Sequence, residues 1–251
     1  MSASVVFIPD GEVRALPTAL FPDTTSADWD PYAELVDPTG RLVATVGAFL
    51  VRGRGYTALV DLGLGPLHAD TPAGASYRGG QLIDNLATAG VTPDAVDLVV
   101  FTHLHRDHVG WTSLTGRELT FANARHVVHN AEWTYWNDHP APVGPDPETV
   151  LAPLRGTVEF CADGDRLADG LRVIATPGHT PGHISVDLDL GAGEHVVIAG
   201  DVLHSPAQLS NPHWCFGSDL DPQLALTSRK LLLATHGPDV LACGHFAPPT
   251  K

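Results

Sequence analysis

The chain has few cationic side chains: 14 Lys and Arg stand against 29 Asp and Glu in 251 residues, a formal net charge of −15. Binding to nucleic acids or anionic membranes depends on cations that neutralise phosphates, so this balance argues against both as partners. A small neutral molecule suits the composition better. The length is sufficient for one large core, and we expect a single domain over residues 1–251.

Cysteine is also scarce. The three cysteines, Cys161, Cys215 and Cys243, show no C-x-x-C spacing, which indicates neither a disulfide framework nor a thiolate zinc site. The N-terminal stretch lacks a basic region before a long apolar core, and no apolar run reaches the roughly 18 residues of a membrane span, so we expect neither a signal peptide nor a transmembrane helix. These features predict a reduced, cytoplasmic location.

Histidine, by contrast, is abundant, with 14 residues, and it concentrates in the segment FTHLHRDHVG at 101–110. This segment contains four potential metal ligands: His103, His105, Asp107 and His108. An apolar, β-branched run precedes it, so the motif is predicted on the loop that leaves a buried strand. Imidazole nitrogens and carboxylate oxygens are ligands that zinc and similar divalent metals accept. Alternate side chains of such a loop can reach one metal while the remaining pair reaches a second.

Three further candidates follow apolar, strand-like runs. They are His179 in PGHTPGH, Asp201 at the end of VVIAGD and His245 in ACGH. In each case the run ends in a glycine-containing turn that carries one His or Asp. Such turns at one sheet edge can build a metal site, which favours this reading over a surface cluster of histidines.

Together, HLHRDH, PGHTPGH, GD at Asp201 and GH at His245 resemble the metallo-β-lactamase superfamily, from about Val43 to His245. The resemblance implies an α/β fold, a four-layer αββα sandwich with its site along one edge. It implies a first metal on His103, His105 and His179, and a second on Asp107, His108 and His245, with Asp201 bridging. Because all seven positions are filled, it implies a dinuclear metal-dependent hydrolase. Asp61 is implied to support the metal loop by hydrogen bonds.

The segments HLHRDHVGW, FANARHVVHNAEWTYW and GDVLHSPAQL are similar to the branch with N-acyl homoserine lactone lactonases and methyl parathion hydrolase. In many of these lactonases a Tyr three residues after the bridging Asp contacts the substrate carbonyl. Here His204 stands at that position, nearer to the methyl parathion hydrolase pattern. His204 is therefore a candidate to donate a hydrogen bond to the carbonyl or the leaving group, or else a packing residue.

We predict hydrolysis of a neutral ester-like bond, with a lactone as the preferred substrate, by a hydroxide shared between two metals, and with Asp201 and His204 as catalytic residues. Zinc is the first choice of metal, and iron, cobalt and manganese suit the same ligands. The alternatives are a thioesterase of the glyoxalase II kind, a phosphotriesterase, and a non-hydrolytic metal redox or sensor protein. A β-lactamase role is disfavoured because no signal peptide is expected.

Periodicity and turn residues predict the main elements: a strand hairpin over 42–65, helices over 81–89 and from 131, a strand at 125–129, and a helix over 223–234 with Arg229 and Lys230 exposed. Residues 1–40 and about 130–160 include Pro-rich, aromatic stretches and are predicted to cap the active site. The first stretch could instead cover a partner in a homodimer. Trp133 and Trp136 are candidates for substrate contact, with the core as the alternative.

Overall fold

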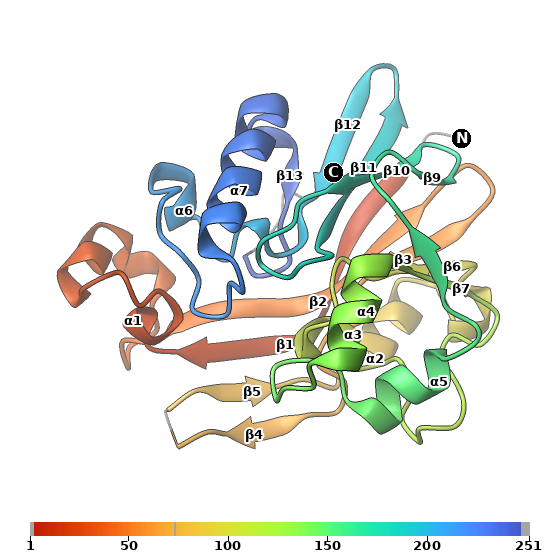
Figure 1. The fold of residues 1–251 in the computed structure, drawn as a ribbon, viewed down its shortest axis with the longest axis horizontal. Coiled ribbons are helices and arrows are strands. Elements are labelled where there is room, and N and C mark those ends of the chain that lie inside the picture. Colours follow the sequence, from red (N-terminus) through yellow and green to blue (C-terminus); the bar gives the residue numbers. More distant parts are fainter. Residues whose placement is uncertain (1–2, 73, 247–251) are drawn as a thin grey trace.

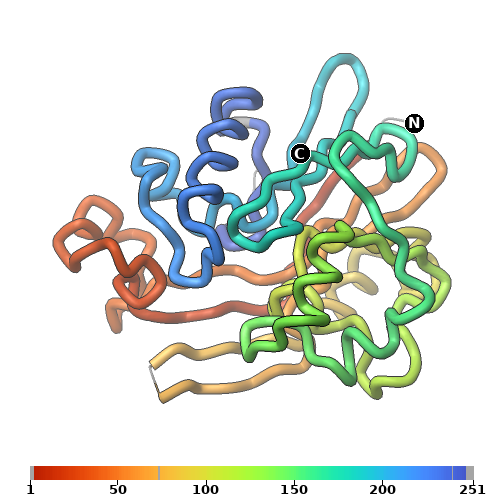
Figure 2. Tube along the Cα trace, in the orientation of Figure 1, coloured from red at the N-terminus to blue at the C-terminus, as the bar shows by residue number. Residues whose placement is uncertain are grey.

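The structure, a computed structural model, describes residues 3–72 and 74–246 (Figures 1 and 2). Within these residues the larger sheet has eight strands, in the order β4 (His68–Asp70), β5 (Ser76–Arg78), β1 (Ser4–Ala15), β2 (Leu42–Arg52), β3 (Thr57–Val60), β6 (Leu98–Val100), β7 (Arg125–His129) and β8 (Glu159–Cys161). The smaller sheet has five, in the order β13 (Leu241–Ala242), β12 (Glu194–Ile198), β11 (Ile184–Gly191), β10 (Leu171–Ala175) and β9 (Arg166–Ala168).

The helices of the described part lie in the connections between strands. The α-helices are α1 (Pro17–Leu20), α2 (Leu82–Thr88), α3 (Arg106–Val109), α4 (Asn130–Asp138), α5 (Ala152–Leu154), α6 (Ala207–Ser210) and α7 (Pro222–His236). Short 3₁₀ or π segments are η1 (Ser26–Leu35), η2 (Pro93–Ala95), η3 (Pro147–Leu151), η4 (Gly200–Val202) and η5 (Pro238–Val240).

The central strands bury both faces, which explains their nearly continuous apolar sequence. In β2, Leu50 packs into the cluster beneath α2 and α4, while its neighbour Val51 packs into the cluster shared by the two sheets. The same alternation places Val99 of β6 on the helical side and Val100 between the sheets. Side chains of successive strand residues point to opposite faces, so each strand contributes to two cores.

Four layers result from this packing. The two sheets share one core, α2 covers the outer face of the larger sheet through Leu82 and Leu86, and α7 covers the smaller sheet through Leu232. Figure 1 shows α2 to α5 and α7 on opposite sides of the paired sheets. The predicted αββα fold class is confirmed.

Most of the predicted elements are also present. The hairpin appears as β2 paired antiparallel with β3, and β7 spans the predicted residues 125–129. The prediction that Arg229 is exposed is wrong, because its side chain is fully buried beneath α7. The side chain of a long charged residue on an outer helix normally lies in solvent. Arg229 is buried because its guanidinium has buried partners in the structure.

Parts of the two segments predicted to cap the site belong to the sheet and to the outer helical layer. Residues 4–15 are the strand β1, paired over its whole length with β2, and are therefore part of the sheet. Residues 130–138 form α4, which packs in the outer helical layer. Among the residues described, no helix combines the length and the apolar character needed to cross a membrane.

Candidate metal centre

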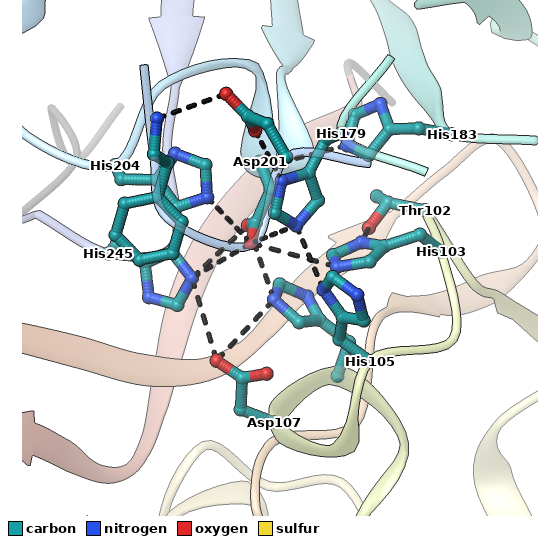
Figure 3. Close-up of polar contacts among 12 residues, drawn as sticks. Thr102, His103, His105, Asp107, His179, His183, Asp201, His204 and His245 are labelled. Carbon is teal, nitrogen blue, oxygen red and sulfur yellow. Dashed lines mark hydrogen bonds and ion pairs between the residues drawn. The ribbon is translucent and has the colours of Figure 1, made fainter. Parts of the chain in front are cut away.

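The seven predicted ligands meet at one edge of the sandwich, where strands of both sheets end (Figure 3). His103 and His105 stand on the loop that follows β6, and Asp107 and His108 lie in α3, directly after it. The other three follow β10, β12 and β13, one each. The ligand atoms of His103, His105, His179 and Asp201 all lie within 4.8 Å of one another, and the same holds for Asp107, His108 and His245. Two groups that could each hold one metal ion therefore lie side by side. A third group with the same spacing, Asp201, His204 and His245, shares members with both.

Asp201 lies between these two groups. Its Oδ2 is 3.3 Å from His179 Nε2 and 3.6 Å from His103 Nε2. Its Oδ1 is 3.2 Å from His108 Nε2 and 3.1 Å from His245 Nε2. His245 Nε2 also lies 3.2 Å from Oδ2, so this imidazole is close to both oxygens, while the other three imidazoles are divided between them. The carboxylate therefore lies between the two groups, where it could bridge two cations.

Four of the histidines are oriented through the ring nitrogen that points away from the centre. The outer Nδ1 contacts are His103 with Thr102 Oγ1 at 3.1 Å, His108 with Asp61 Oδ2 at 2.8 Å, His179 with Asp219 Oδ1 at 2.8 Å, and His245 with the Thr45 carbonyl at 3.0 Å. A carboxylate or carbonyl can only accept, so at His108, His179 and His245 the Nδ1 carries the proton. The Nε2 lone pair is then free for a metal.

The donor set fits a divalent cation. Among the described residues, His103 Nε2, His108 Nε2 and Asp201 Oδ1 are buried and have no hydrogen-bond partner. Buried polar atoms without partners are rare, and several that converge on one point indicate a group that the protein chain alone does not provide. Imidazole with carboxylate is a ligand chemistry that zinc, iron, cobalt and manganese accept.

Burial and nearby carboxylates act in opposite directions on the histidines of this cluster. Burial lowers the pKa of His103 and of His105 well below the usual range, so both rings are neutral, as metal ligands must be. Burial also disfavours the charged form of the other three histidines, but Asp201 raises their pKa above the usual value, so these rings give up a proton when a metal binds: His108, His179 and His245. Burial alone would raise the pKa of Asp201, but the surrounding imidazoles, His108 and His245 first, hold it well below its usual range. Asp201 is therefore an anion at the centre of the site.

Asp61 supports the metal loop as predicted. Its Oδ1 accepts from the Thr102 amide at 2.8 Å, and its Oδ2 accepts from Thr102 Oγ1 at 2.8 Å and contacts His108 Nδ1. Asp61 is one of two non-glycine residues with positive φ in the described chain, at 63°. Backbone strain of this kind persists where the surroundings over-determine it, as these three contacts do.

Glu132 is a site residue that sequence reasoning missed. Its carboxylate is fully buried and accepts from the Leu104 amide at 2.9 Å, from the Gly182 amide at 3.0 Å and from Trp136 Nε1 at 2.6 Å. It thereby joins the loop of His105 to the loop of His179. Burial raises its pKa. Nothing in the sequence around a lone Glu on an aromatic helix signals this role.

A cavity of about 500 Å³ opens beside the ligands. Asp201, His105, Asp107 and His245 form part of its wall, and the remaining lining is mainly apolar. The apolar residues include Val13, Leu20, Leu42, Ala44, Leu64, Leu67, Val143 and Phe216. The volume suits a small molecule that presents one polar bond to the metal centre and an apolar remainder to the apolar part of the lining.

His204 lies at the junction of the cavity and the centre. Its ring stacks on Phe216 with centroids 3.6 Å apart and an interplanar angle of 9°, and its Nε2 is 3.1 Å from Asp201 Oδ2. Its backbone amide donates to Gln208 Oε1 at 2.7 Å. Burial lowers the pKa of His204 to about 4, so the ring is neutral near pH 7. The ring is held rigidly within reach of a molecule in the cavity.

The two tryptophans lie elsewhere, and neither is among the residues that line the cavity. Trp136 is buried in the core beneath the larger sheet, where its ring edge contacts the ring of His105 at 5.4 Å and its Nε1 donates to Glu132. Trp133 is partly buried and lies against Phe160, with ring centroids 6.3 Å apart. Their placement favours the packing alternative, and substrate contact stays a prediction without support from this geometry.

Paired sheets under outer helices, with a buried His and Asp cluster at one edge, define a class of metal-binding hydrolytic proteins. The chain belongs to the metallo-beta-lactamase superfamily, whose family model matches residues 45–245. It is a metal-dependent hydrolase of this family. The family supplies the fold and the general chemistry, while the substrate depends on the cavity of each member.

Curated relatives extend this result. The chain is 33% identical to metallo-beta-lactamase domain-containing protein 1 of Mus musculus over 197 residues, which cover 78% of this chain and 65%, just under two thirds, of the mouse protein. It is 30% identical to the probable metallo-hydrolase YflN of Bacillus subtilis, over 61% of this chain and 65% of that protein. The N-acyl homoserine lactonase of Bacillus thuringiensis is 26% identical over 61% of this chain and 56% of its own length.

Solved structures share the fold. AidC, a dizinc quorum-quenching lactonase in complex with a product, superimposes with a TM-score of 0.82 at 20% identity, covering 99% of this chain and 89% of that chain. The hydrolase AbOPH superimposes with a TM-score of 0.81 at 26% identity, with the same coverage of 99% and 89%.

Proposed function

We propose that the chain hydrolyses a neutral ester-like bond, with a lactone as the preferred substrate, at a centre of two divalent metal ions. The observation that carries this proposal is the placement of Asp201 between the two groups of ligands. Its Oδ2 lies near His103 and His179, its Oδ1 lies near His108, and both oxygens lie near His245. The first metal would be held by His103, His105 and His179, and the second by Asp107, His108 and His245, with Asp201 shared. Zinc is our first choice, supported by the dizinc content stated for AidC.

Two such ions would supply an acidified water for attack and electrophilic assistance to the carbonyl oxygen. The chain holds part of this ligand set in the required state, because the buried imidazoles of His103 and His105 are neutral and Asp201 is anionic. The contacts of Asp61 and Asp219 fix the ring orientation of two further ligands. The protein thus presents a preorganised set of donors that needs little rearrangement on binding.

His204 is proposed as the residue that donates a hydrogen bond to the carbonyl oxygen or the leaving group. In the present geometry its Nε2 contacts Asp201 Oδ2 at 3.1 Å, so this contact must be exchanged for one to the substrate. The stack on Phe216 holds the ring plane while that exchange occurs. The alternative is that His204 only packs, and kinetics of its variants separate the two roles.

The cavity supports a substrate with an apolar remainder. Leu42, Leu64 and Leu67 are among the apolar residues that line it. The net charge of −15 disfavours a polyanionic substrate, which leaves a neutral lactone or ester with an acyl or aryl group. The similarity to an N-acyl homoserine lactonase supports the same class.

We further propose that residues 17–35 and the segment around Val143 cover this cavity. Leu20 of α1 and Val143 line it directly. Phe21 packs on Phe216 with ring centroids 5.4 Å apart, so the N-terminal segment also supports the ring that stacks on His204.

The three cysteines are free thiols, which supports the cytoplasmic location predicted from the sequence.

The test is a hydrolysis screen of zinc-reconstituted protein against lactones, aryl esters, thioesters and phosphotriesters. The proposal predicts the highest kcat/KM for a lactone with an apolar side group, and loss of turnover in Asp201→Ala. A thioester preferred over every lactone would assign the glyoxalase II type of chemistry instead. Absence of hydrolysis for all four classes, with metal bound, would contradict the proposal.

A further inference from the structure

A buried chain of contacts runs outward from His179 to a charged pair beneath α7. His179 Nδ1 contacts Asp219 Oδ1 at 2.8 Å, and Asp219 Oδ2 lies 3.7 Å from Arg229 Nη2. The side chains of Asp219 and Arg229 are both fully shielded from solvent. Desolvated charges are unfavourable unless they are paired and hydrogen-bonded, so a pair kept at this depth calls for an explanation.

We propose that Asp219 is a positioning residue that keeps the proton of His179 on Nδ1 and thereby sets the metal affinity of the centre; this rests on the proposed function, in which His179 is a ligand. A carboxylate can only accept, so it selects the Nδ1–H form of the ring. The Nε2 lone pair then points at the cluster, where Nε2 lies 2.9 Å from His105 Nδ1 and 3.3 Å from Asp201 Oδ2. Without Asp219 the proton can occupy Nε2, which blocks coordination.

Asp219 is itself held in place from several sides. Its Oδ2 accepts from the Phe216 amide at 3.0 Å. The next two residues bond the backbone of the His179 loop: the Leu220 amide donates to the His179 carbonyl at 3.0 Å, and the Asp221 amide donates to the Gly178 carbonyl at 2.9 Å. Backbone hydrogen bonds therefore hold the loop of Asp219 against the turn that carries His179. Asp219 stays in place even if the imidazole of His179 is displaced.

Arg229 connects this arrangement to the rest of the site. Its Nε donates to the Val202 carbonyl at 2.7 Å, directly after Asp201, and its Nη1 donates to the carbonyls of Pro212 at 2.8 Å and Trp214 at 3.0 Å. Among the described residues, Asp219 is the one carboxylate within ion-pair distance of this guanidinium. One buried cation thus ties the loop that supports His179 to the turn that carries Asp201.

The test compares Asp219→Asn with Asp221→Asn in the full chain. Asp221 lies in the same loop, but its carboxylate accepts from the Leu224 amide at the start of α7 and contacts no proposed ligand. Zinc affinity is measured by competition with a chromophoric chelator. Loss of an outer carboxylate partner of a ligating histidine typically weakens metal binding about 10- to 100-fold, which we expect for Asp219→Asn. Asp221→Asn should bind zinc like the wild type.

Long-range ¹H–¹⁵N NMR of the zinc-loaded wild type gives a readout that does not need Asp219→Asn, should that variant fail to fold. The His179 signals, identified by their absence in His179→Gln, should show the proton on Nδ1. A proton on Nε2, unchanged zinc affinity in Asp219→Asn, or an equal loss in Asp221→Asn would each overturn the inference. A chain that shows the expected affinities and tautomer but hydrolyses no ester supports this inference and contradicts the proposed function alone.

Discussion

Replacement of Asp10 by Asn tests how the fold holds the loops around the site. Asp10 is fully buried at the irregularity of β1 between Pro9 and Gly11. Its carboxylate accepts five N–H donors: Leu64 N at 2.7 Å, Gly65 N at 3.0 Å, Gly80 N at 3.1 Å, Leu82 N at 2.9 Å and Trp111 Nε1 at 2.8 Å. These donors belong to a cavity wall, the start of α2 and the segment after the metal motif.

The number of donors on each oxygen determines how much stability Asp10→Asn should lose. Oδ2 accepts two of the donors and Oδ1 the other three, so whichever oxygen becomes an amide nitrogen in Asp10→Asn, at least two buried N–H groups face another donor. Each unsatisfied buried donor costs about 1–3 kcal/mol, which gives a loss of roughly 2–6 kcal/mol in the free energy of unfolding. For a chain of this size that corresponds to about 4–24 °C in Tm.

The assay is urea and thermal unfolding of metal-free protein, with Asp97→Asn as the matched control. Asp97 is exposed and its Oδ2 accepts from the amide of Thr57 at 2.8 Å, so this variant should lose less than about 1 kcal/mol. If Asp10→Asn unfolds at the same urea concentration as Asp97→Asn, the reasoning about the five donors is wrong.

Substitutions at three further residues test the centre. Asp201→Ala should lose metal as well as turnover, because the anion between the two cations is removed; full metal content by elemental analysis would show that the bridge lies elsewhere. Asp61→Asn should weaken metal binding about 10- to 100-fold by placing an N–H opposite His108 Nδ1, and an unchanged chelator competition curve would contradict this role. His204→Ala should lower kcat roughly 10- to 1000-fold at constant metal content, with partial recovery of lactone cleavage in His204→Tyr, whereas unchanged kinetics would make it a packing residue.

The sequence predicted the parts of the site that are local. Each of the seven predicted ligands follows an apolar run and a turn, and such patterns extend over fewer than about ten residues, so they can be recognised without a fold. The four-layer fold was predicted through the resemblance that those motifs carry. The two tryptophans show the limit of the method, because an aromatic residue on a helix has the same pattern whether it lines a cavity or fills a core.

The supporting residues could not be predicted, because their partners are distant in sequence. Asp10 and Trp111 are 101 residues apart, and His179 and Asp219 are 40 apart. A single Asp or Arg between polar neighbours is usually exposed, as we expected of Arg229. The tertiary structure brings such groups into buried networks of hydrogen bonds. Only there does it become visible that their charged side chains support the site.

A zinc titration of metal-free protein, with hydrolysis of a lactone followed at each addition, tests the central claim most directly. The two groups of ligand atoms around Asp201 predict that turnover rises until two equivalents of zinc per chain are bound and then stays constant. Full turnover at one equivalent, or turnover that persists in the metal-free chain, would contradict a two-metal hydrolase.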